Sequence, residues 1–60
     1  MKRTFLQDEA NTHYNLGIAL AQSGEIPKAI GQYEQARKLR PDFTAASNAL
    51  VRLRANLPDR

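Results

Sequence analysis

The 60-residue sequence contains no cysteine and no tryptophan, and it has a single histidine. Without cysteine there can be no disulfide and no thiolate metal site. One histidine alone does not make a histidine-rich metal site. A chain this short buries a small core, and natural chains of this size often need disulfides, a metal or association to become stable. Association is therefore the route to stability that we consider.

Long hydrophobic runs are also missing. No apolar run approaches the roughly 18 residues that a membrane-spanning helix needs. The basic start Met1-Lys2-Arg3 is followed only by Phe5 and Leu6 before polar residues resume, so the apolar region of a secretion signal is absent. We therefore expect a soluble, cytoplasmic chain without a membrane partner. If the chain is a piece of a longer protein, this expectation of its location lapses.

The residues needed for catalysis are not arranged for it. A nucleophilic triad could use only Asp8, His13 and Ser23, and Ser23 lies ten residues from His13 on one predicted helix. At about 1.5 Å per residue the two are roughly 15 Å apart, which is too far for a proton relay. The three glycines do not form a phosphate-binding loop. We expect no enzymatic activity, no cofactor and no metal.

The chain is mildly basic, with nine lysines and arginines against six acidic residues and a formal net charge of +3. In the C-terminal half the basic residues are Arg37, Lys38, Arg40, Arg52, Arg54 and Arg60. They support an alternative in which the chain is a basic helical module that binds nucleic acid. Stacking on bases needs exposed aromatic rings, and we expect Tyr33 and Phe43 to be structural. A solvated charged face is the favoured interpretation.

Helix signals divide the first part of the chain. A first helix is predicted over about residues 8–22, with Asp8 as its N-cap. Gly24 can adopt the left-handed conformation that ends a helix. Pro27 suits the first turn of a second helix, predicted over about residues 26–39. The connection is so short that the two helices are expected to be antiparallel. A third helix is predicted after Pro41, over about residues 43–56.

Each predicted helix carries an apolar stripe that we expect to pack inward. The stripes are His13, Leu16, Gly17 and Leu20 on the first helix, Ile26, Ala29, Ile30, Tyr33 and Ala36 on the second, and Ala46, Ala49, Leu50, Leu53 and Leu57 on the third. A glycine in a helix interior costs about 1 kcal/mol relative to alanine. Gly17 is therefore best explained by a close approach of the second helix.

Leu16 recurs as Leu50, a shift of about 34 residues that matches a known helical-repeat period. Leu16-Gly17, Leu20, Ala29, Tyr33, Ala36 and Pro41 resemble the tetratricopeptide repeat (TPR) family. The resemblance implies an all-α fold, namely an antiparallel helix–turn–helix hairpin with a third, capping helix. His13 departs from the family, which usually has a large aromatic residue there.

The resemblance also implies a division of the chain. It consists of a lead-in at 1–7, a single TPR motif at 8–41, a capping helix at 42–57 and a tail at 58–60. Val51 and Arg54 stand where a following repeat would have its glycine and its large apolar residue. The third helix is therefore expected to end the array, and its polar outer side suits a cap.

The implied function is that of a non-catalytic protein–protein interaction scaffold. In the family, the first helix of each repeat lines a concave groove that holds an extended peptide or a partner helix. On the side of the predicted first helix opposite its apolar stripe, the corresponding face carries Asn11, Asn15, Ile18 and Gln22. Asn15 matches a position that often binds the ligand backbone in the family, and Tyr14 lies just off this face, where it is expected to flank the groove. On the third helix the candidates are Asn48 and Arg52. A polar face that contacts only solvent explains these residues equally well.

One repeat is short for the family, because about three are usually needed to bury a continuous core. We therefore expect the chain to form a homo-oligomer, most simply a dimer, or to stack on neighbouring repeats. Alternatively, the chain is a fragment whose neighbours supply the missing faces. The partner itself is expected to be a protein or a peptide.

Overall fold

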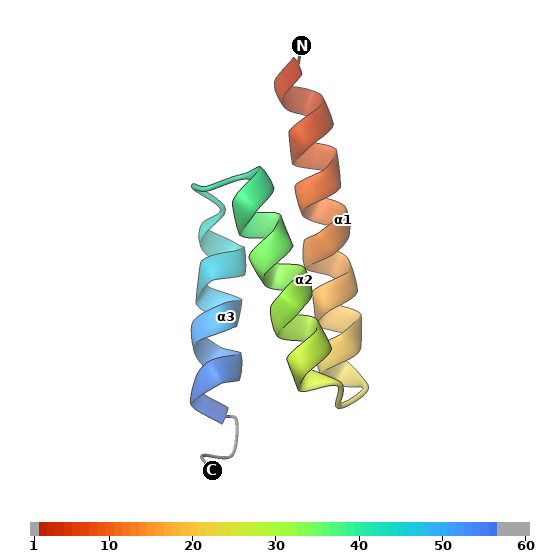
Figure 1. The fold of residues 1–60 in the computed structure, drawn as a ribbon, viewed down its shortest axis with the longest axis vertical. Coiled ribbons are helices and arrows are strands. Elements are labelled where there is room, and N and C mark those ends of the chain that lie inside the picture. Colours follow the sequence, from red (N-terminus) through yellow and green to blue (C-terminus); the bar gives the residue numbers. More distant parts are fainter. Residues whose placement is uncertain (1, 57–60) are drawn as a thin grey trace.

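A computed structural model describes the backbone of residues 2–56 and the side chains of residues 8–55. This part of the chain forms three helices, α1 (Lys2–Gln22), α2 (Ile26–Leu39) and α3 (Thr44–Asn56). As Figure 1 shows, α2 lies between α1 and α3 and runs antiparallel to both. The predicted all-α fold, a helical hairpin followed by a third helix, is confirmed.

The start of α1 differs from the prediction. The helix begins at Lys2 rather than at Asp8, and its first turns project beyond the end of α2 (Figure 1). Residues 2–7 contain no glycine or proline, so nothing in this stretch stops a helix. Asp8 lies inside the helix instead of capping it, and its carbonyl accepts a hydrogen bond from Thr12 Oγ1 at 2.9 Å.

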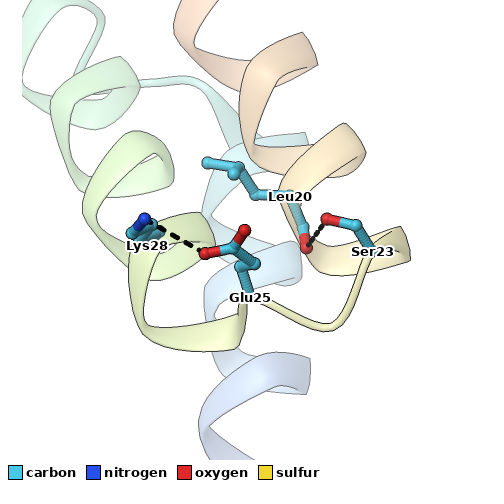
Figure 2. Close-up of polar contacts among 4 residues, drawn as sticks. All are labelled: Leu20, Ser23, Glu25 and Lys28. Atoms are coloured by element: carbon cyan, nitrogen blue, oxygen red, sulfur yellow. Dashed lines mark hydrogen bonds and ion pairs between the residues drawn. The ribbon is translucent and has the colours of Figure 1, made fainter.

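The turn between α1 and α2 follows from the glycine that the sequence places there. Gly24 has a φ of 89°, a left-handed conformation that side chains disfavour. The Leu20 carbonyl at the end of α1 accepts hydrogen bonds from the Glu25 N–H at 2.8 Å and from Ser23 Oγ at 3.0 Å. Figure 2 shows the bond from Ser23 to Leu20, together with the ion pair of 3.1 Å between Glu25 and Lys28 at the start of α2. The turn thus satisfies carbonyls that would otherwise lack a partner.

The interface between α1 and α2 is as close as the small residues predict. Ala29 and Ala36 are fully buried, and Tyr33 is only 4% exposed. A Cβ atom added to Gly17 would lie 2.7 Å from Cε1 of Tyr33, so only glycine fits against this ring. His13 joins the two helices as well, because its Nδ1–H donates a hydrogen bond of 2.6 Å to Oε1 of Gln32.

The core comprises two connected groups of buried residues among those described. One contains Ala10, Ala36, Phe43 and Ala46, and the other contains Ala29, Tyr33 and Leu50. Tyr14 packs against both groups and so links them. On α3, Ala46 and Leu50 face the core as predicted, with Ala49 and Leu53 partly buried beside them. Leu57, the tail at 58–60 and Met1 lie outside the described residues.

The inward face of α1 is rotated from the predicted stripe. Leu16 is 45% exposed, so the expectation that it packs inward is wrong. Ile18, expected on the opposite, polar side, instead packs against the group around Tyr33. The helix turns Ala10, Tyr14 and Gly17 towards its neighbours, at helical spacing. In this orientation the Tyr14 ring contacts Tyr33 on α2 and Phe43 just before α3.

Candidate functional site

A cleft of about 380 Å³ is formed by residues from all three helices. Its lining consists of Tyr14 from α1, Tyr33 from α2, and Ala45, Asn48, Ala49, Arg52 and Leu53 from α3. The residues from α3 stand largely at intervals of three and four, which places them on one helix face. Because Leu50 anchors the neighbouring face of α3 in the core, this lining face is held towards Tyr14 and Tyr33.

Aromatic packing fixes the tyrosine side of the cleft. The ring centroid of Tyr14 lies 5.6 Å from that of Tyr33 and 5.1 Å from that of Phe43, and both pairs are tilted by about 45°. Such tilted pairs stabilise a structure beyond the apolar area that they bury. Arg40 covers Phe43, with its Cζ atom 4.7 Å from the ring centroid. Tyr14 therefore forms a wall whose position is set from two sides.

The surroundings of the Tyr33 hydroxyl further favour its neutral form. Burial raises the pKa of Tyr33 above its ordinary value of 10.0, and the nearby Tyr14 hydroxyl acts in the same direction. A neutral phenol can both donate and accept a hydrogen bond. The lining of the cleft thus combines residues with neutral polar groups, the two tyrosines and Asn48, with the apolar Ala45, Ala49 and Leu53.

The charge lining the cleft is positive. Arg52 is the one ionised side chain in the lining, and it is exposed. The ion pairs among the described residues lie elsewhere and join Lys28 to Glu25 at 3.1 Å, Arg40 to Asp42 at 3.4 Å and Arg54 to Glu34 at 2.6 Å. The last of these connects α3 to α2 on the outer surface. No described carboxylate therefore neutralises Arg52.

The structure brings together three of the seven predicted groove residues. Tyr14, Asn48 and Arg52 line the cleft. The remaining four lie on α1 outside the lining: Asn11, Asn15 and Gln22 are exposed, and Ile18 is half-buried. The participation of these residues in binding stays a prediction.

Sequence reasoning missed four lining residues, namely Tyr33, Ala45, Ala49 and Leu53. The two alanines could have been found from the sequence, because they flank Asn48 and Arg52 at helical spacing. Tyr33 was expected to be structural, and it is indeed buried. Its place in the lining depends on how α3 packs against α2, which no local sequence pattern encodes.

The described residues do not assemble a metal site or a membrane-spanning helix. Among the side chains of residues 8–55, no three histidine, cysteine or acidic groups come close enough to hold a metal ion. Within the described helices, none combines the length and apolar character that crossing a bilayer requires. The cleft can provide hydrogen bonds, apolar contacts and one positive charge.

A comparison with known proteins gives the family. No curated protein and no solved structure matches the chain. A family model described as tetratricopeptide repeat matches residues 10–43, which is more than half of the sequence. The matched segment contains most of α1, all of α2 and the turn that leads to α3. Members of this family generally mediate protein–protein interactions and are typically non-catalytic. The chain therefore belongs to the tetratricopeptide repeat family.

Proposed function

We propose that this chain is a non-catalytic interaction module that binds an extended segment of a partner protein across α1 and α3. The observation that carries the proposal is the cleft in which Tyr14 meets Asn48 and Arg52. Asn48 and Arg52 are the groove candidates on the third helix that the resemblance to the family implies, and Tyr14 was expected to flank that groove. Membership of the family supports a protein partner rather than a small-molecule substrate.

The polar side chains suit an extended peptide. An asparagine or glutamine amide offers two donors and an acceptor, which match the N–H and C=O groups of a peptide backbone. Asn11, Asn15 and Gln22 are exposed on α1, so they are available to continue the contacts that begin at Asn48 in the cleft. A volume of about 380 Å³ lies at the lower end of the range for ligand pockets. It accommodates one or two side chains of a bound segment.

The test uses random twelve-residue peptides displayed on phage and selected on the immobilised chain. Selected peptides are then titrated against Asn48→Ala and against Gln35→Ala, a control on the exposed surface of α2. Both substitutions place alanine at an exposed helical site, so both favour the helix. A lost neutral hydrogen bond corresponds to about 0.5–1.5 kcal/mol, so we expect affinity to fall about 3- to 10-fold for Asn48→Ala alone.

Two results contradict the groove assignment. Peptides whose affinity is unchanged by Asn48→Ala bind elsewhere on the chain. A selection that yields no peptide with measurable affinity removes the support for a peptide-binding role. Thermal unfolding of both variants, followed by circular dichroism, establishes that a change in affinity does not come from a change in folding.

We further propose that the chain associates, either as a homodimer or with neighbouring repeats. Leu16 on α1 and Val51 on α3 are 45% and 67% exposed, and these helices flank α2 on its two sides (Figure 1). The proposed division into one motif at 8–41 and a capping helix at 42–57 agrees with this, because a single repeat leaves apolar residues uncovered. The family match at 10–43 supports that division.

Sedimentation equilibrium over a wide concentration range tests the association. We expect a dimer or larger species at high concentration, and a shift towards monomer when Leu16→Gln and Val51→Gln are combined. Association that removes these side chains from water also raises the melting temperature with concentration. A chain that is monomeric at every concentration contradicts the homodimer. Association that is equally strong with both substitutions contradicts the assignment of Leu16 and Val51 to the interface.

A further inference from the structure

We propose that the bound segment carries an acidic side chain, and that Arg52 in the lining of the cleft binds the carboxylate of that side chain. This inference rests on the proposed function, because it names the chemistry of the partner that occupies the same cleft. It is carried by the distribution of charge around the cleft and by the apolar surface beside Arg52.

Arg52 is the one positively charged residue in the lining, and none of the described acidic residues belongs to the lining. Glu25, Glu34 and Asp42 each pair with another basic residue. The two remaining acidic residues with described side chains, Asp8 and Glu9, are on α1 and do not line the cleft. A cleft lined by charge of one sign attracts groups of the opposite sign. The complementary group is an anion.

The surroundings of Arg52 favour a carboxylate on a short aliphatic stem. Asn48 lies one helical turn before Arg52, and Ala45 and Ala49 provide apolar surface next to them on the same face of α3. The methylene groups of a glutamate or aspartate can contact these alanines. A guanidinium can then bind the carboxylate through two parallel N–H···O bonds. The Asn48 amide remains for the backbone of the bound segment.

A protein segment is favoured over nucleic acid as the source of the anion. Recognition of single strands needs a basic track and free aromatic faces. Arg40 instead covers Phe43 and pairs with Asp42, while Arg54 pairs with Glu34 on α2. The Tyr14 ring already packs between two other rings. The cleft therefore has one cation and no unoccupied stacking platform among its described residues.

The tyrosines make a direct readout possible. Tyr14 and Tyr33 are the two tyrosines of the sequence, which has no tryptophan, and both line the cleft. Their fluorescence therefore reports occupancy when the added peptide contains neither residue type. The probes are arrayed octapeptides of mixed aliphatic and polar sequence, N-acetylated and C-amidated, made as pairs that differ only by glutamate or glutamine at one central position. The strongest binders are titrated in solution.

The matched variants are Arg52→Gln and Arg37→Gln. Each removes one positive charge, and Arg37 is exposed on α2 outside the cleft lining. A charge-assisted hydrogen bond is about twice as strong as a neutral one. We expect glutamate peptides to bind the natural chain about tenfold more tightly than their glutamine partners. That preference should fall to about twofold in Arg52→Gln and persist in Arg37→Gln.

Each other outcome overturns the inference in a recognisable way. Equal binding of glutamate and glutamine peptides removes the acidic preference but leaves peptide binding in place. A preference lost equally in Arg37→Gln reduces the effect to net charge. Two further probes, the same peptides made with a free C-terminal carboxylate and an oligothymidylate, are titrated alongside. Tighter binding of either one than of the amidated glutamate peptides identifies a different anion. If no peptide binds, the proposed function fails together with this inference.

Discussion

Replacing Gly17 by alanine should destabilise the hairpin, although alanine is the better helix former. The added Cβ atom would lie 2.7 Å from Cε1 and 2.8 Å from Cδ1 of Tyr33, closer than such contacts occur in proteins. The ring cannot simply move away, because it is only 4% exposed and packs against Tyr14. Overpacking of this kind costs about 1–3 kcal/mol. The gain in helix propensity offsets about 1 kcal/mol, which leaves a net loss of up to about 2 kcal/mol.

Gly31 provides the matched control. It lies in the interior of α2, and a Cβ atom added there would meet nothing within 4 Å. Gly31→Ala should therefore stabilise the chain by about 1 kcal/mol through helix propensity alone. Because both substitutions share this propensity gain, the difference between the two variants isolates the contact between Gly17 and Tyr33. We expect that difference to be about 1–3 kcal/mol in the free energy of unfolding.

Urea and thermal unfolding, followed by circular dichroism at 222 nm, measure this difference. For a domain of this size, 1 kcal/mol corresponds to a shift of about 4–8 °C in melting temperature. Equal stability of Gly17→Ala and Gly31→Ala would refute the close packing of α1 on α2. All samples must be compared at one concentration, because association would contribute to stability.

Three further predictions follow from the same structure. Gly24→Ala should cost about 1 kcal/mol, because the φ of 89° disfavours any side chain, and chemical denaturation will measure the loss. Burial, and secondarily the Tyr14 hydroxyl, raises the pKa of Tyr33, so the unfolded chain loses the phenol proton at a lower pH than the folded chain does. The free energy of unfolding should therefore stay constant below about pH 10 and decrease as the pH rises further. This decrease should be smaller in Tyr33→Phe. The 2.6 Å pair of Arg54 and Glu34 is largely exposed, so a double-mutant cycle with glutamine at each position should give about 0.2–1 kcal/mol, decreasing with salt.

The sequence predicted the hairpin well because its signals are local. The bounds of α2 are those predicted, since Gly24 and Pro27 before it and Pro41 after it restrict the backbone directly. The close approach of the second helix to Gly17 was predicted because a glycine inside a helix lowers the stability of that helix and therefore calls for a packing reason. The start of α1 was misplaced because Asp8 has the chemistry of an N-cap, whereas the preceding residues simply continue the helix.

The candidate site was only partly predictable, because it depends on how the helices cross. Resemblance to the family pointed to Asn48 and Arg52 on the third helix and to Tyr14 beside the groove. Helical spacing predicted that Leu16 packs inward, but Leu16 is exposed, and Tyr14 is the residue of α1 that packs against both groups of buried residues. The contribution of Tyr33 to the lining also arises from the crossing of α2 and α3. Rotation of a helix by a fraction of a turn cannot be read from periodicity alone.

The most direct test of the binding account is to record nuclear Overhauser contacts between the chain and a bound peptide taken from the display selection. If the partner segment binds in the cleft, the peptide should show contacts to the Tyr14 ring and to the methyl groups of Ala45 and Ala49, which line the cleft. Contacts confined to the flank around Leu16, or to the surface of α2 around Gly31, would contradict it.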